Sequence, residues 1–203
     1  MTAVRRETVL RRRIIEAAAE ITARTGWSSV TMAGLGDAVG VSRQTVYNEV
    51  GSKQALAESM VLHELAEFLV LVDRAFDDHP LDAVAAVRQA VRDILALAEA
   101  NPLVRAILAG AAGPDSDLLP LLTTRSHDLL EMARIATEQR LAPLTPWVEE
   151  SRRAAAVDVI VRTVLSHVTQ SSGDPDTVAD DVAWAAERML SQRSMAMVGA
   201  PAM

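Results

Sequence analysis

Apolar residues recur every three to four positions along most of the chain, which is the pattern of amphipathic helices. The first such stretch runs over 9–25, with Ile14 and Ala18 in its apolar stripe, and Gly26 ends it. Two short stretches follow at 32–39 and 43–50. Thr31 and Ser42 stand where N-caps belong, so the pattern predicts three short helices within the first fifty residues.

The rest of the chain predicts longer helices. Ser52 can cap a helix over 53–76, which ends in the turn at 77–80. Proline, glycine and asparagine separate the later stretches, which predict helices at 81–99, 103–111, 117–141, 147–170 and 176–191. Alanine and leucine dominate the composition, which favours helix over sheet. We therefore expect an all-α protein with a small domain at 1–52 and a larger bundle of about six helices at 53–203.

The charge is unevenly distributed, although the net charge is −7. Residues 1–60 hold eight Lys or Arg against six Asp or Glu, whereas the remainder holds twelve against twenty-one. The basic excess is greatest before residue 14, where Arg5, Arg6, Arg11, Arg12 and Arg13 face only Glu7. This end could bind phosphate, although a solvated charged tail explains the same pattern.

Several kinds of chemistry are excluded or unsupported. The chain has no cysteine, so it has no disulfide, thiolate metal site or thiol nucleophile. None of its four histidines lies four residues from another, so no helical two-histidine zinc site is indicated, and no cofactor is expected. The start resembles no secretion signal, and charges interrupt every stretch of membrane length. We expect a cytoplasmic protein without a membrane partner.

The segments 32–39 and 43–50, joined at Gly40-Val41, have the spacing of a helix-turn-helix. The residues of TGWSSVTMAGLGDAVGVSRQTVYNEVGSKQAL make the pattern more specific. Its marks are Gly26-Trp27, Thr31, the run 38–42, the run 45–47, and the run 51–53. Over residues 10–60 the chain closely resembles the DNA-binding domain of the tetracycline-repressor (TetR) family.

The resemblance implies that three residues face base edges and four hold phosphates. The base-reading residues would be Arg43, Gln44 and Thr45, and the phosphate-binding residues would be Thr31, Ser42, Tyr47 and Lys53. The chemistry agrees, because arginine can bond guanine and glutamine can bond adenine from the N-terminal end of a recognition helix. Lys53 is the sole lysine and stands at a helix N-terminus, where anions bind favourably.

Three positions depart from the family's pattern. Gly36 stands where alanine is usual and should weaken its helix by about 0.5 to 1 kcal/mol. Glu49 and Val50 replace aromatic or basic residues, and Glu49 would repel a nearby phosphate. The apolar residues of the small domain are expected to form its core; these are Trp27, Val30, Leu35, Val39, Val41 and Val46.

In this family the last two long helices pair with those of a second copy. The resemblance therefore implies a homodimer, which a two-fold, palindromic DNA operator also requires. Candidate interface residues are the apolar positions of the last two helices, with core packing as the alternative for each. They are Val157, Val161, Leu165, Val168, Val182, Ala186, Met189 and Leu190.

The resemblance also implies a pocket for a small-molecule effector between the long helices. Few charges fall on the inner faces, so a largely apolar effector is expected, and its binding would release a repressor from its operator. Candidate lining residues, for which ordinary core packing is again the alternative, are Phe68, Leu69, Val72, Leu108, Leu122, Leu129, Met132 and Val164.

Two other classes of function compete with this interpretation. A helical-bundle enzyme lacks support, because the chain has neither paired Glu-x-x-His motifs nor a G-x-S-x-G elbow, and we expect no enzyme. A helical adaptor that does not bind DNA is suggested by Glu49 and by the acidic total. Strong salt dependence of DNA binding would exclude the adaptor.

Overall fold

The computed structural model describes residues 9–104, 126–170 and 173–191. Every regular element in these ranges is a helix, so the all-α prediction is confirmed for the described part of the chain. The predicted helices at 103–111 and at the start of 117–141 fall largely outside these residues.

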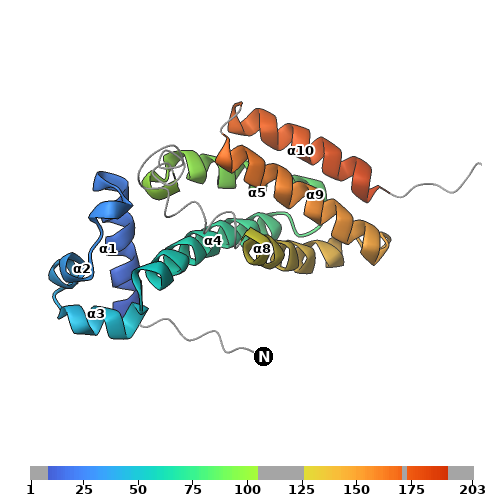
Figure 1. Ribbon diagram of the computed structural model, residues 1–203. Coiled ribbons are helices and arrows are strands. Elements are labelled where there is room, and N and C mark those ends of the chain that lie inside the picture. Colours follow the sequence, from blue (N-terminus) through green and yellow to red (C-terminus); the bar gives the residue numbers. More distant parts are fainter. Residues whose placement is uncertain (1–8, 105–125, 171–172, 192–203) are drawn as a thin grey trace, which may run out of the picture.

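The first helices gather at one end of the molecule (Figure 1). They are α1 (Val9–Thr25), the short 3-10 helix η1 (Trp27–Ser29), α2 (Met32–Val39) and α3 (Arg43–Val50). The predicted N-caps are confirmed, since the side chains of Thr31, Ser42 and Ser52 accept hydrogen bonds from the backbone N–H groups of Gly34, Thr45 and Ala55. Gly40 ends α2 with a positive φ of 77°, a conformation that glycine adopts without strain.

The long helix α4 (Lys53–Asp78) runs from this end into the larger bundle (Figure 1). The bundle continues with α5 (Ala83–Ala100), α8 (Ser126–Leu141), the 3-10 helix η3 (Ala142–Leu144), α9 (Glu150–Thr169) and α10 (Pro175–Leu190). Helix α10 packs mainly on α5, and α8 packs on both α4 and α9.

Two hydrophobic cores form, one at each end of α4. The small core contains all the predicted residues, with Val41 partly buried at its edge. It also takes Leu56, Ala57 and Met60 from the first turns of α4, and Leu103 from the segment after α5. The N-terminal core therefore extends past residue 52.

Candidate DNA-binding face and ligand pocket

The exposed face of α3 is formed by Arg43, Gln44, Tyr47 and Asn48. Val46 and Val50 lie on the opposite side, fully buried in the small core, and their burial fixes which face of α3 is exposed. Two (i, i+4) contacts order the exposed side chains. The Arg43 guanidinium lies over the Tyr47 ring, 5.4 Å from its centroid, and the Gln44 amide donates to Asn48 Oδ1 at 3.1 Å.

Asn48 was not among the residues predicted from the sequence. Its place four residues after Gln44, on the same helical face, is the signal that could have found it. Thr45 is partly buried, and its hydroxyl lies 2.9 Å from that of Ser42. The four exposed residues offer hydrogen-bond donors and acceptors of the kind that read base edges.

Lys53 is the first residue of α4, and its side chain contacts the first helices. Its Nζ donates to the backbone carbonyl of Trp27 at 2.9 Å and lies 4.8 Å from the centroid of the Trp27 ring. This contact joins the start of α4 to η1. A phosphate contact by Lys53 remains a prediction, and the lysine also helps to hold the small domain together.

The arginines of α1 bind mainly within the protein. Arg11 donates to the backbone carbonyl of Glu49 and, at 2.6 Å, to the Ser59 hydroxyl, so it joins α1 to α3 and α4. Arg13 donates at 3.1 Å to the carbonyl of Val39, at the C-terminal end of α2. Both guanidinium groups thus brace the helix-turn-helix. Glu49 is partly buried beside Arg11 rather than on the exposed face of α3, and Arg5 and Arg6 lie outside the described residues.

Gly36 is required by the turn, which corrects the expectation that it merely weakens α2. A Cβ at this position would lie 2.6 Å from the backbone carbonyl oxygen of Val41, and 3.3 Å from the backbone nitrogen of Arg43. In return, the Val41 N–H donates to the carbonyl of Gly36 at 2.8 Å. Alanine would not fit, because the connection passes directly over this glycine.

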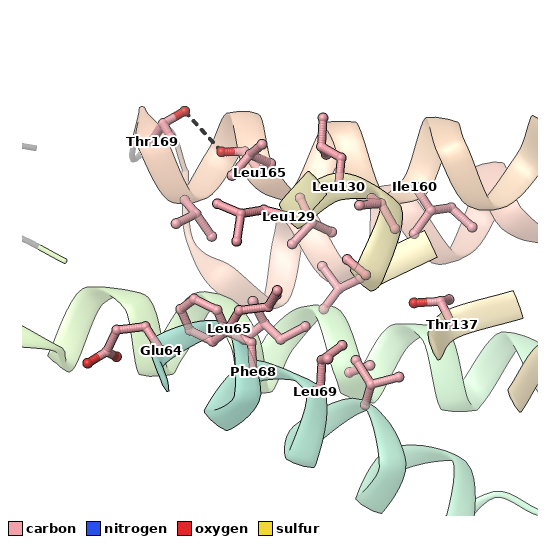
Figure 2. A pocket seen from close by; sticks show the side chains of 18 of the residues that line it. Glu64, Leu65, Phe68, Leu69, Leu129, Leu130, Thr137, Ile160, Leu165 and Thr169 are labelled. Atoms are coloured by element: carbon pink, nitrogen blue, oxygen red, sulfur yellow. Dashed lines mark hydrogen bonds between the residues drawn. The ribbon is translucent and has the colours of Figure 1, made fainter. Parts of the chain in front are cut away.

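A cavity of about 230 Å³ lies inside the larger bundle, between α4, α5, α8 and α9 (Figure 2). The structure brings five predicted residues together around it: Phe68, Leu69, Val72, Leu129 and Val164. Met132 is a correction, since it is 38% exposed and does not line the cavity. Leu108 and Leu122 lie outside the described residues.

Among the described lining residues, three side chains with polar groups interrupt the apolar surface. They are Glu64, Thr137 and Thr169. Glu64 Oε2 accepts a hydrogen bond from Asn101 Nδ2 at 2.5 Å. Burial raises the pKa of the Glu64 carboxyl above its ordinary value of 4.5, although the bond from Asn101 acts in the other direction.

The segment that follows α5 contacts both the core of the small domain and the cavity. Asn101 bonds Glu64 at the cavity, Leu103 is buried in the core of the small domain, and Val104 lines the cavity. The Asn101 side chain also accepts hydrogen bonds from the backbone N–H groups of Leu103 and Val104. A short stretch of chain therefore joins the cavity to the helix-turn-helix.

The chain matches two family profiles. The profile described as bacterial regulatory proteins of the tetR family matches residues 14–60, and that described as the C-terminal domain of the bacterial tetracycline repressor matches residues 82–188. The HTH-type transcriptional regulator AlkX of Mycobacterium tuberculosis is 34% identical over 177 residues, covering 85% of this chain and 81% of that protein. The chain belongs to the TetR family of transcriptional regulators.

Solved TetR-family structures share the fold. The repressor AlkX of Dietzia sp., implicated in biodegradation of n-alkanes, superposes with a TM-score of 0.71 at 27% identity, covering 88% of this chain and 94% of that one. FadR of Thermus thermophilus, a transcriptional repressor solved in complex with lauroyl-CoA, gives a TM-score of 0.59 at 19% identity over 94% and 100% of the two chains. The second likeness shows the fold alone.

The residues predicted for a TetR-type dimer interface are mostly used within the monomer. Val157, Val182, Ala186 and Leu190 are buried in the larger core, and Met189 packs against it. Val161, Leu165 and Val168 line the cavity. This corrects the assignment of the buried positions to a dimer interface, because the apolar stripe of α10 packs against α5 of the same chain. The exposed apolar residues of these two helices include Val159 and Trp184, which are 49% and 60% exposed, and the predicted Leu165, which is 38% exposed, so its place in an interface stays a prediction.

Within the described residues, no helix has the length and hydropathy that a membrane span requires. The same part of the chain holds no cluster of three or more His, Asp or Glu suited to a metal ion. The two AlkX relatives are described as a transcriptional regulator and a repressor.

Proposed function

We propose that this TetR-family chain is a transcriptional repressor that binds a palindromic operator as a homodimer and is released by a small, largely apolar effector. The observation that carries the proposal is the position of α4. Its first turns pack in the core of the helix-turn-helix, through Leu56 and Met60, and its later turns form a wall of the cavity, through Phe68 and Leu69.

Ligand binding can change DNA affinity through this shared helix. A molecule that fits the cavity better in one position of α4 favours that position, and α4 directly follows the recognition helix α3. Leu103 and Val104 offer a second connection, since adjacent residues lie in the small core and at the cavity. In a dimer, a shift of both α4 helices would alter the spacing of the recognition helices, which must match half-sites about one helical turn apart.

The apolar lining supports a hydrocarbon-like effector. A related repressor points the same way, since the AlkX of Dietzia sp. is implicated in the biodegradation of n-alkanes. The contacts to DNA in the proposal are those named from the sequence, with Arg43, Gln44 and Thr45 at base edges. Asn48 is added because it shares the exposed face of α3.

The test is binding of the purified protein to the DNA immediately upstream of its own gene at two salt concentrations. We expect specific binding that weakens steeply with salt, because phosphate contacts release counterions. The Arg43→Ala/Gln44→Ala double variant should lose the specific binding and keep its fold. Binding that is absent, or insensitive to salt and to the double variant, would favour the adaptor instead.

The release step has a separate test. An effector that lowers the affinity for DNA must itself bind less tightly to the DNA complex, by the same factor. A ligand that occupies the cavity without changing operator affinity would refute the coupling while leaving DNA binding intact.

A further inference from the structure

Thr137 places a hydroxyl group in the wall of the apolar cavity. It lies on α8 and is 8% exposed, so it is shielded from bulk solvent. Figure 2 shows the Thr137 oxygen turned toward the aliphatic side chains around the cavity. Ion pairs hold α8 against α9 on either side of it, between Arg134 and Asp158 at 3.5 Å and between Glu138 and Arg153 at 3.8 Å.

The hydroxyl of Thr137 differs from those of the other helical threonines. Several threonines of the described helices donate to the backbone carbonyl four residues earlier, as Thr22 does to Ala18 at 2.7 Å and Thr163 does to Val159 at 2.7 Å. Thr45 and Thr177 instead bond the side chains of Ser42 and Asp174. Thr169, which also lines the cavity, bonds the carbonyl of Leu165 at 2.9 Å. Among the threonines that the structure describes, Thr137 alone makes no side-chain hydrogen bond of this or any other kind.

The Thr137 hydroxyl faces the cavity without a partner in the described part of the protein, and polar groups that are shielded from bulk water are nearly always hydrogen-bonded. A ligand in the cavity could supply the missing partner. A threonine hydroxyl can donate to an oxygen or accept from an O–H group, so an alcohol or a carbonyl would satisfy it.

The charges around the cavity argue against an anionic ligand group. Among the described lining residues there is no Lys, Arg or His, and the one ionisable side chain is the acidic Glu64. A carboxylate placed in the cavity would therefore lack a positive partner, which is costly in an apolar site. Glu64 is bonded to Asn101, at the other end of the view in Figure 2 from Thr137.

The size of the cavity limits the ligand. Benzene occupies an apolar cavity of about 150 Å³ in a protein core, so about 230 Å³ can accept a somewhat larger molecule. We propose that the Thr137 hydroxyl is the polar anchor of this cavity, and that its ligand is an uncharged molecule with an apolar body and a single alcohol or carbonyl oxygen. This inference rests on the proposed function only in taking that molecule as the effector.

The experiment compares three eight-carbon probes on the free protein: 1-octanol, octanoate and n-octane. Calorimetry gives Kd for 1-octanol and octanoate, and the rise in Tm in saturated solution reports binding of n-octane. We expect the wild type to prefer 1-octanol to octanoate. Thr137→Val should raise Kd for 1-octanol about three- to tenfold, the value of one hydrogen bond, and should leave the Tm rise with n-octane unchanged.

Two variants serve as matched controls. Thr137→Ser keeps the hydroxyl and should retain the preference for 1-octanol. Thr169→Val removes a hydroxyl from the same cavity that is already bonded to Leu165, so the affinity for 1-octanol should not change. Unfolding of the free protein adds a readout without ligand, because Thr145→Val loses the bond from the buried Thr145 to Leu141 and should lower Tm, whereas Thr137→Val should not.

Several outcomes would overturn the proposal. They are a failure of 1-octanol to bind the wild type, tighter binding of octanoate, an equal loss of n-octane and 1-octanol binding in Thr137→Val, and no loss of either. These affinities are measured without DNA, so they separate this proposal from the proposed function. Binding of 1-octanol through Thr137 with no effect on operator affinity would support the anchor and refute the role as effector.

Discussion

Gly36 and Val41 approach each other closely in the helix-turn-helix, since a Cβ on residue 36 would lie 2.6 Å from the Val41 carbonyl oxygen. Both partners are backbone or rigidly attached to it, so a side chain cannot be accommodated by a rotamer change. Helix propensity alone would favour alanine here by about 0.5 to 1 kcal/mol. The steric term has the opposite sign and is the larger of the two.

We therefore predict that Gly36→Ala lowers the free energy of unfolding by about 1 to 3 kcal/mol, measured by urea denaturation. Gly34→Ala, on the same helix, is the matched control. Its Cβ would meet only the Thr31 hydroxyl, at 3.1 Å, which is a side-chain atom rather than backbone but is also the N-cap of α2, so we expect a smaller loss than at Gly36. If Gly36→Ala were as stable as the wild type or more stable, the connection between α2 and α3 would have to move to make room for the added methyl group.

Lys53 is expected to matter for stability in the absence of DNA. Lys53→Met removes the hydrogen bond to the Trp27 carbonyl and the contact with the Trp27 ring, and should cost about 1 to 2 kcal/mol by urea denaturation. Arg12→Met is a fair comparison, since Arg12 is exposed and pairs only loosely with Glu16, at 3.7 Å. A loss no larger than that of Arg12→Met would make Lys53 a plain surface charge in the free protein.

Glu64 should make stability depend on pH. Its pKa is raised in the folded protein, so the folded state holds the proton more tightly than the unfolded chain does. The contribution of this group to stability is therefore present in acid and is lost as the pH rises from about 4.5 through the raised folded pKa.

Glu64→Gln removes this titration and can still accept a bond from Asn101. We predict that the variant is more stable than the wild type at neutral pH, and that its advantage shrinks as the pH falls through that window. Free energies of unfolding at a series of pH values give the difference, with Glu187→Gln, at an exposed position of α10, as the control. A stability difference between Glu64→Gln and the wild type that does not change with pH would contradict a raised pKa of Glu64 in the folded protein.

Val159 is the more exposed of two exposed large apolar residues of α9, the other being Leu165, and we expect it to face a second copy of the chain. Val159→Glu should turn dimers into monomers in sedimentation velocity without loss of helicity, because a charge in an apolar interface is unfavourable. Leu62→Glu places the same charge on an equally exposed residue of α4 and should leave the dimer intact. Monomeric wild type, or dimeric Val159→Glu, would remove this residue from the interface.

The helices were largely predictable because their boundaries are encoded locally. Thr31, Ser42 and Ser52 cap the helices that they were predicted to cap, and Gly26, Gly40 and Gly51 end the segments before them. A capping side chain or a glycine with positive φ acts within a few residues, so a single sequence contains the whole signal.

Other features could not be predicted because they depend on which surfaces meet. Apolar spacing marks Val157 and Ala186 as buried, yet it does not say whether the covering partner is α5 of the same chain or a second copy. The role of Thr137 likewise depends on the absence of a bond that other threonines make. The position of Leu103 in the small core joins residues more than forty positions apart, and no local pattern reports that.

The two cores have a consequence for engineering chimeras with other TetR-family members. Leu103 completes the N-terminal core, and its neighbour Val104 belongs to the cavity wall. A graft that exchanges only residues 1–52 would therefore place a foreign DNA-binding unit on the native Leu56, Met60 and Leu103, with mismatched volumes at each contact. A working exchange has to carry these three positions and Ala57 together with residues 1–52, so the transferable module is defined by shared packing and is discontinuous in sequence.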